Sequence, residues 1–257
     1  MDYLIRFVKA LVPEQYHPTL GEIHRICRSF LYIGNRYICP CCGWRFRKLL
    51  PYGNRKRPNV GCPRCNSAER HRLLWLYLKN KTNLFSDNLK VLHFAPEYIF
   101  QKTLRFMSNL ISVDLNSPLA MVKMNITNIS YQDNTFDVIL CSHVLEHVID
   151  DQKAMRELFR VIKPGGWAIL QVPLSNESDK TFEDPSIVSP RYREHIFGQK
   201  DHVRIYGRDY KDRLEKAGFT VKVDGYVKEL ESDRIRKYGL IVDENIYFCT
   251  KPRLEKD

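Results

Sequence analysis

The stretch NITNISYQDNTFDVILCSHVLEHVIDDQKAMRELFRVIKPGGWAILQV, residues 125–172, carries the clearest pattern of secondary structure in the chain. Its segment FDVILCS, residues 136–142, is almost wholly apolar, which is typical of a strand buried on both faces of a parallel sheet. A helix is expected next, stopped by the KPGG of residues 163–166 and followed by the strand WAILQV, residues 167–172. The apolar face of this helix would hold Met155, Leu158, Phe159 and Ile162. This order of strand, helix and strand predicts a parallel sheet covered by helices.

More strand segments lie on both sides of this unit. Upstream, the segments LKVLHF, LISVD and MVKMNI, residues 89–94, 110–114 and 121–126, are the first three predicted strands, and a helix from Pro96 to about Met107 follows the first. Downstream, the sequence predicts a helix over 208–218 and two last strands at 220–224 and 245–251. Together these segments predict an α/β fold whose sheet has seven strands, with helices on both faces.

The LEH of residues 145–147 and the KPGG that ends the next helix make this region resemble the class I S-adenosylmethionine-dependent methyltransferases. The resemblance covers about residues 88–250. It implies a Rossmann-like methyltransferase sheet in a domain over 81–257, with S-adenosyl-L-methionine as the cofactor. The long segment 173–207 lies after the fifth strand, over the sheet edge where substrates of such folds bind, and is expected to be a lid.

The resemblance also implies the cofactor contacts. The turn after the first strand would pack against the methionine part, the acid after the second strand would bind the ribose, and the residue after the third strand would meet the adenine amine. The implied cofactor-binding residues lie at the ends of the first four strands. They are His93, Phe94, Ala95, Pro96 and Glu97 after the first strand, Asp114 and Leu115 after the second, Asn125 and Ile126 after the third, and Ser142 and His143 after the fourth. Asp114 also has the spacing of a ribose-binding carboxylate, although an acid after a strand is often a helix cap instead.

The first motif departs from the family pattern at two places. HFAPE, residues 93–97, stands where the family has an acid followed by two spaced glycines, and Asn125 stands in place of an aspartate. Ala95 is small, and the N-terminus of the following helix still offers free N–H groups to a ligand. The amide oxygen of Asn125 can still accept a hydrogen bond.

Cysteine spacing predicts a metal site ahead of this domain. Two CxxC pairs are separated by 19 residues, which is a strong signal for a zinc ribbon. The predicted ligands are Cys39, Cys42, Cys62 and Cys65. Four thiolates leave no open position, so the Zn²⁺ is expected to be structural, with Cys41 outside the shell. Gly43 and Asn66 suit the left-handed exits of the two knuckles.

Residues 1–80 are predicted to form a module of short helices, the ribbon and a connecting helix. The first helix would present Leu4, Phe7, Val8 and Leu11 on one face, for core packing or, as the alternative, for peripheral membrane contact. The connecting helix would start at a capping box of Asn66 and Glu69. Arg70 and Arg72 near its start are expected either as solvated surface or as an anion-binding pair beside the metal.

The net charge of +11 is concentrated in the N-terminal module. Residues 1–80 hold 15 Lys and Arg against 4 Asp and Glu, whereas the remainder is balanced. Such a surface is either a solvated basic face or a binding site for an anionic partner such as RNA, lipid headgroups or a phosphorylated sugar. No apolar run is long enough for a transmembrane helix and no secretory leader is recognisable, so a cytoplasmic location is expected. The sequence makes no prediction of oligomeric state.

The predicted lid supplies candidates for catalysis. Methyl transfer is an in-line displacement at a sulfonium, so it needs alignment and, for a hydroxyl nucleophile, a base. His202 is the candidate base, unless it is only a hydrogen-bonded loop histidine, and His143 could face the methyl donor. Arg204 and Tyr206 are candidates for binding an anionic or glycan-type acceptor.

Three functions follow from these features. The motifs LHFAPE, CPxC with an ERHR helix, and FGQKDHVRIYG resemble a zinc-ribbon subgroup of these methyltransferases associated with glycan and surface-polysaccharide modification. The first hypothesis is therefore an O-methyltransferase acting on a sugar or glycan precursor. The second is an RNA methyltransferase that binds RNA through its basic N-terminal module. The third is a non-catalytic scaffold with a degenerate cofactor turn.

Overall fold

The protein folds into two units, seen in a computed structural model that describes residues 12–13, 16–53, 56–104, 106–118, 120–175 and 177–253. The first unit comprises residues 1–82 and 226–244, and the second comprises residues 83–225 and 245–257. The segment 226–244, which the sequence analysis assigned to the methyltransferase domain, thus belongs with the ribbon. The apolar face expected at Leu4, Phe7, Val8 and Leu11 lies outside the described residues.

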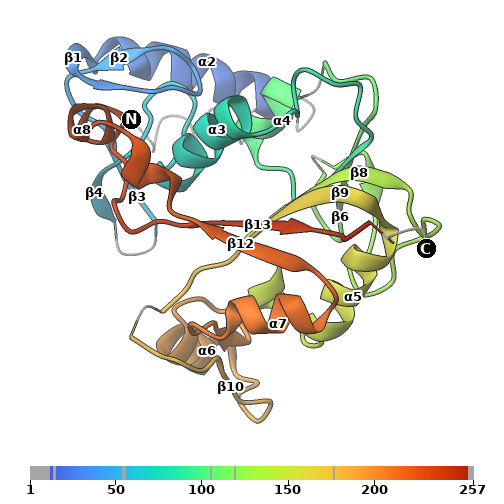
Figure 1. Cartoon of the computed structure of the whole chain (residues 1–257). Coiled ribbons are helices and arrows are strands. Elements are labelled where there is room, and N and C mark those ends of the chain that lie inside the picture. Colours follow the sequence, from blue (N-terminus) through green and yellow to red (C-terminus); the bar gives the residue numbers. More distant parts are fainter. Residues whose placement is uncertain are drawn as a thin grey trace. The chain divides into compact units, whose positions relative to one another are not determined.

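The second unit is built on a seven-stranded sheet in the order β12-β13-β9-β8-β5-β6-β7 (Figure 1). Its strands are β5 Val91–Phe94, β6 Leu110–Asp114, β7 Val122–Lys123, β8 Phe136–Ser142, β9 Ile162–Gln171, β12 Thr220–Asp224 and β13 Ile246–Thr250. Strand β13 is antiparallel to β12 and β9, and the other neighbouring pairs are parallel. The predicted seven-stranded α/β fold is confirmed.

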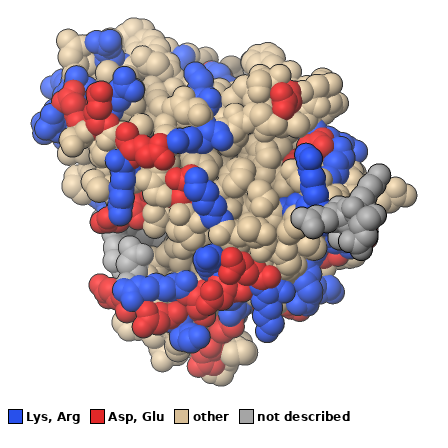
Figure 2. Space-filling model, in the orientation of Figure 1, with Lys and Arg blue, Asp and Glu red and all other residues tan. Residues whose placement is uncertain are grey.

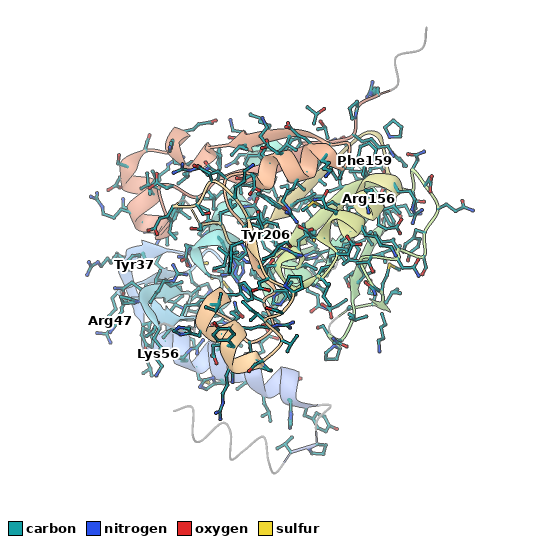
Figure 3. The ribbon with its side chains drawn as sticks, turned by 90° about the horizontal axis from the view of Figure 1, so that it is seen from below. Tyr37, Arg47, Lys56, Arg156, Phe159 and Tyr206 are labelled. Atoms are coloured by element: carbon teal, nitrogen blue, oxygen red, sulfur yellow. The ribbon has the colours of Figure 1, made fainter. Side chains whose placement is uncertain are left out.

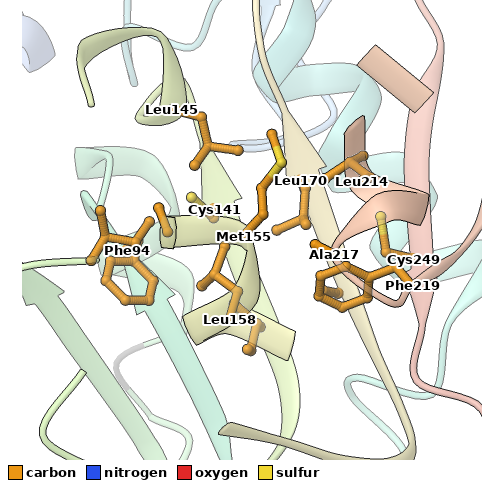
Figure 4. Packing of buried hydrophobic residues seen from close by; sticks show 14 of the residues in the cluster. Phe94, Cys141, Leu145, Met155, Leu158, Leu170, Leu214, Ala217, Phe219 and Cys249 are labelled. Atoms are coloured by element: carbon orange, nitrogen blue, oxygen red, sulfur yellow. The ribbon is translucent and has the colours of Figure 1, made fainter. Parts of the chain in front are cut away.

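Helices α5 (Asp151–Val161) and α7 (Tyr210–Lys216) lie on the same face of this sheet (Figure 1). Their buried side chains, such as Met155, Leu158 and Leu214, belong to one apolar cluster with sheet residues such as Leu170 (Figure 4). The opposite face of β5 contacts α4 (Tyr98–Leu104). Packing on both sides explains why the central strands are apolar along their whole length.

The region of the KPGG motif differs from the prediction. Helix α5 ends at Val161, and β9 begins at Ile162 and runs through the two glycines. Gly165 has φ +80°, and a Cβ at Gly166 would lie 2.8 Å from the carbonyl oxygen of Asp137. The motif therefore lets a strand start with a sharp bend close to β8, and Ile162 belongs to the sheet rather than to the helix face.

The segment 173–207, predicted as an irregular lid, contains secondary structure of its own. Strand β10 (Phe182–Glu183) pairs antiparallel with β11 (Arg204–Ile205), and α6 (Pro190–Phe197) lies between them. An isolated bridge joins Leu174 to Tyr206. The two ends of the insertion are therefore paired with each other, which fixes the position of residues 202–206.

The first unit combines two small hairpins with helices. Its elements are α2 His17–Phe30, β1 Ile33–Ile38, β2 Arg45–Phe46, β3 Leu50–Tyr52, β4 Arg57–Gly61, α3 Glu69–Lys81, the 3-10 helix η3 Tyr226–Glu229 and α8 Ser232–Tyr238. Strands β1 and β2 pair antiparallel, as do β3 and β4. Among the described residues no helix is both long and apolar enough to cross a bilayer.

The capping box predicted at Asn66 and Glu69 is wrong. Helix α3 begins at Glu69 itself, and its N-cap is Ala68, whose backbone N–H donates to His71 Nδ1 at 3.0 Å. Asn66 instead has φ +60°, the left-handed conformation expected for the exit of the second cysteine knuckle. Asn66 therefore belongs to the cysteine knuckle, and the helix is capped by Ala68 and His71 instead.

Arg72 is completely buried, which does not fit the anion-binding role considered for it. Its guanidinium donates hydrogen bonds to four backbone carbonyls, those of Val60, Ser67, Tyr238 and Gly239. Arg72 thus ties α3 to the ribbon and to the end of α8. Arg70 is only partly buried, with its guanidinium 5.7 Å from the centre of the Tyr52 ring.

Candidate cofactor pocket and cysteine cluster

A pocket of about 800 Å³ opens at the carboxyl ends of β5, β6 and β8. This volume is within the range of small-molecule sites, and the carboxyl edge of a parallel sheet is where folds of this type bind ligands. Seven of the predicted cofactor residues line it, namely Phe94, Ala95, Asp114, Leu115, Asn125, Ile126 and His143. Residues from three separate strand ends are thus brought together as expected.

The other four predicted cofactor residues do not line the pocket: His93, Pro96, Glu97 and Ser142. His93 points to the opposite face of β5, where its ring contacts that of Phe100 at 6.3 Å. Burial there lowers the pKa of His93 to about 4, so the side chain is neutral near pH 7. His93 therefore belongs to the packing beneath the site.

Ala95 makes a sharp turn directly after β5. Its φ is +47°, in the left-handed region that side chains with a Cβ rarely adopt, and its N–H donates to Val113 O at 2.9 Å. His143, at the end of β8, also has a positive φ, +56°. Strained residues of this kind concentrate at functional sites, and both of these face the pocket.

Asp114 lies at the end of β6 with half of its carboxylate engaged. Its Oδ1 accepts hydrogen bonds from the backbone N–H groups of Asn116 and Ser117, at 2.7 and 2.6 Å. These bonds hold the turn and fix the orientation of the carboxylate. The Oδ2 atom accepts none from the described residues and remains available to a ligand in the pocket.

Asn125 and Ile126 follow the third strand and form another wall of the pocket. Asn125 is exposed, and its Oδ1 accepts hydrogen bonds from Thr127 N and Oγ1, both at 3.0 Å. Ile126 is 6% exposed and packs in the apolar cluster. The pair thus offers an apolar surface beside a polar edge, which suits a purine ring.

A group of histidines surrounds Glu146 at one end of the pocket. His143 and His147 line the pocket, with Asp201 beside His147 at 3.1 Å between Nδ1 and Oδ2. His202 is only 5% exposed and does not line the pocket, but its ring contacts the His147 ring with centres 4.6 Å apart. Burial lowers the pKa of His202. A buried position behind His147 does not suit the direct base expected of His202.

Arg204 and Tyr206 lie in a buried ion-pair cluster and not in the pocket. The Arg204 guanidinium donates to the carbonyls of Leu145, Val148 and Ile149 and to the Glu183 carboxylate. The Tyr206 hydroxyl donates to Asp151 Oδ2 at 2.7 Å. The role of acceptor anchor therefore does not fit Arg204, whose donors are used to hold the turn after β8.

We expect Arg204→Lys to destabilise the second unit by about 3 kcal/mol, because an ammonium cannot reach three carbonyls and two carboxylates at once. The matched control is Arg208→Lys, since Arg208 makes an exposed ion pair with Asp179, of the kind that contributes little. Urea unfolding, monitored by circular dichroism, measures the free energy of unfolding of both variants. Equal, small effects of the two substitutions would contradict the positioning role of Arg204.

The first unit gathers four cysteines into one cluster. The ligand atoms of Cys39, Cys42, Cys62 and Cys65 all lie within 4.8 Å of one another. The Sγ atoms of Cys39 and Cys65 are 3.5 Å apart, and those of Cys42 and Cys62 are 3.7 Å apart. A tetrahedron with Zn–S bonds of about 2.3 Å requires S···S distances of about 3.8 Å, so the four residues fit a zinc ion.

Cys41 is not one of the four grouped cysteines: its Sγ lies 3.7 Å from the carbonyl oxygen of His71, although it also contacts the Cys39 thiol. Burial raises the pKa of the Cys41 thiol well above its usual range, which favours the neutral form. Gly43 and Asn66, at the exits of the knuckles, have φ +75° and +60°. The N–H groups of Gly43 and Asn66 donate to the carbonyls of Cys39 and Cys62, closing both tight turns.

The sequence analysis missed four titratable residues that line the pocket, His147, Asp150, Lys153 and Asp201, and two buried acids beside it, Glu146 and Asp151. Glu146 is 1% exposed within a turn that carries two histidines, and Asp151 pairs with both Arg204 and Arg213. Glu146 lies in LEHVIDD, a segment with three acids next to a strand end, and that concentration of acids is an available signal for it. The pairing of Asp151 depends on residues more than 50 positions away, so no local pattern indicates it.

Comparison with known proteins agrees with this geometry. Residues 98–170 match the family profile described as a methyltransferase domain. The ubiquinone/menaquinone biosynthesis C-methyltransferase UbiE of Vibrio campbellii is 28% identical over 123 residues, 46% of this chain and 46% of that protein. UbiE of Escherichia coli O1:K1 / APEC is 33% identical over 118 residues, 41% of this chain and 47% of its own. The chain spans less than half the length of either relative.

Among solved structures, the [4+2]-cyclase SpnF superposes with a TM-score of 0.51 at 16% identity, covering 71% of this chain and 82% of that one. This likeness concerns the fold. The family profile concerns residues 98–170 alone, and the superposition shows that the sheet has the Rossmann-like fold of these methyltransferases.

Proposed function

We propose that the protein transfers a methyl group from S-adenosyl-L-methionine to a hydroxyl of a sugar or glycan precursor. The observation that carries the proposal is the pocket at the carboxyl edge of the sheet, with the free Oδ2 of Asp114 on one wall and a group of histidines at one end. A carboxylate in that place can accept hydrogen bonds from ribose hydroxyls.

The residues present fit the cofactor. Asp114 would hold the ribose, Ile126 and Asn125 would take the adenine, and the left-handed turn at Ala95 would let the backbone approach the methionine part. The cofactor supplies a methyl group on a sulfonium. The chain itself binds and orients both reactants, since an in-line displacement depends chiefly on alignment.

The acceptor would occupy the end of the pocket near His143, His147 and Asp201. These side chains, together with Asp150 and Lys153 at the start of α5, make that end polar. A polar end suits a hydroxylated acceptor, and the positive charge of Lys153 suits an acceptor with a phosphate or carboxylate. His143 can accept the acceptor's proton at a ring nitrogen.

In the first unit we propose one structural Zn²⁺ held by Cys39, Cys42, Cys62 and Cys65, as in the zinc-ribbon subgroup that the sequence resembles. The sulfur spacing supports this assignment. With four protein ligands the ion would have no open position, so its contribution would be to the folding of the unit.

RNA as the acceptor is the second candidate, because the first unit carries exposed cations. Arg45, Arg47, Lys48 and Lys56 are exposed, and Arg47 and Lys56 project outward in Figure 3, whereas Arg57 is paired with Glu69. On the face drawn in Figure 2, however, positive and negative side chains are interspersed. Mixed charge is a weaker site for a phosphate backbone than a continuous basic stripe.

The experiment that tests the proposed function measures cofactor binding first and the acceptor second. We expect calorimetry to show one site for S-adenosylmethionine or its demethylated product, and radiolabelled methyl transfer to sugar nucleotides and glycan extracts but not to RNA. A pocket that does not bind the cofactor would favour a scaffold. Label transfer to RNA with a steep salt dependence would favour the second candidate.

A further inference from the structure

We propose that Glu146, His147 and His202 form a second metal site, for a divalent cation that binds the acceptor hydroxyl at the end of the pocket. One ligand atom from each of the three lies within 4.8 Å of the other two. Ligand atoms around one ion lie about 3–4 Å apart when the bonds are about 2.0–2.2 Å long, so small side-chain rotations bring all three into its shell. The inference rests on the proposed methyl transfer.

The state of Glu146 is the first independent observation. Its side chain is 1% exposed, and neither carboxylate oxygen accepts a hydrogen bond from a described residue, although His143 Nδ1 lies 3.2 Å from Oε1. Burying a carboxylate without such partners is costly. A cation among these three residues would compensate the charge, and an unsatisfied buried group is a common sign of an ion.

The second independent observation is the state of the His202 ring. Its Nε2 is buried and has no hydrogen-bond partner within the described part of the chain, while its other ring nitrogen is bonded to the backbone carbonyl of Phe197. Histidines that bind metals usually donate their second ring N–H to a carbonyl or carboxylate, which fixes the ring. His147 has the corresponding partner in Asp201.

The backbone holds these residues in register although they come from distant segments. Val203 N donates to Glu146 O at 2.9 Å, and Arg204 donates to the carbonyls of Leu145, Val148 and Ile149. The insertion that carries His202 is therefore attached to the turn that carries Glu146 and His147. The hydrogen bonds of Arg204 therefore hold the turn that carries two of the proposed metal ligands.

Two histidines and one carboxylate leave coordination positions open, as in catalytic rather than structural metal sites. Because His147 lines the pocket, the open positions would face an acceptor there. A hydroxyl bound there would be more acidic, so it would give its proton more readily to the ring nitrogen of His143 in the same pocket. The oxygen then forms a bond to the methyl carbon as the carbon–sulfur bond breaks, and the electron pair stays on the neutral sulfide.

Metal content per chain tests the site without any acceptor. Full-length protein is equilibrated by dialysis against micromolar Zn²⁺, and bound zinc is measured by elemental analysis for wild type, Glu146→Gln and His202→Asn. The control is His195→Asn, an exposed histidine on α6. We expect wild type and the control to bind one more zinc per chain than either of the two variants.

Binding of S-adenosylhomocysteine to the same samples shows whether the second unit is folded, since neither Glu146 nor His202 lines the pocket. Equal zinc content in all four proteins, with that binding retained, would overturn the proposal. If wild type gains the extra zinc but does not bind S-adenosylhomocysteine, the metal site stands and the proposed methyl transfer fails. If a variant loses both, His147→Asn provides the third measurement, and an unchanged zinc content in it would overturn the site.

Discussion

Cys62→Ser should release zinc from the first unit and unfold it. A structural zinc contributes about 10–16 kcal/mol of binding free energy, most of which is folding free energy because the four thiolates come together only in the folded unit. Cys62 is completely buried beside Cys42, so a serine there removes a ligand without offering an exposed substitute. Elemental analysis and circular dichroism should show the loss of one zinc and of part of the ordered structure.

Cys41→Ser is the matched control, since it makes the same chemical change one position from a ligand. Its Sγ lies 3.7 Å from the His71 carbonyl oxygen and also contacts the Cys39 thiol, but Cys41 is not one of the four grouped cysteines. We expect the zinc content to be unchanged and the stability to fall by about 1 kcal/mol or less. Zinc loss in the Cys41 variant together with zinc retention in the Cys62 variant would reverse the assignment of ligands.

The strands of the second unit could be predicted because each has a strong local signal. FDVILCS and WAILQV are apolar runs that only a strand buried on both faces requires, and both lie in central strands. Helix ends were harder. Val161 ends α5 two residues before the KPGG motif, because the glycines serve a bend at the start of β9 rather than a helix stop.

The site was predictable where its residues follow strand ends. Ala95, Asp114 and Asn125 are brought to one pocket by the parallel sheet, since the carboxyl ends of its strands share an edge. Side-chain direction was not predictable. Arg204 and Tyr206 belong to an insertion whose position is set by pairing of β10 with β11 and by long-range bonds to Asp151 and to the carbonyls at 145–149. Such contacts have no periodicity in the sequence.

Asp114→Ala should weaken binding of S-adenosylmethionine by about 3 kcal/mol, roughly a hundredfold in Kd, because the carboxylate would accept charged hydrogen bonds from the ribose hydroxyls. The alanine also removes the bonds from Oδ1 to the N–H groups of Asn116 and Ser117. Part of the loss would therefore come from a loosened turn. Calorimetry on the purified protein measures the affinity.

Asp114→Asn separates the two causes. An asparagine keeps an oxygen for Asn116 N and Ser117 N but removes the charge and replaces Oδ2 by an amide donor. If the ribose contact dominates, Asp114→Asn should lose most of the affinity that Asp114→Ala loses, whereas if the turn dominates it should bind almost as wild type does. The control Asp133→Asn changes an exposed carboxylate paired with Arg160, outside the pocket, and should leave the affinity unchanged. Wild-type affinity in both Asp114 variants would remove the ribose from this wall of the pocket, and with it the orientation that places the methyl group toward His143 and the histidine end.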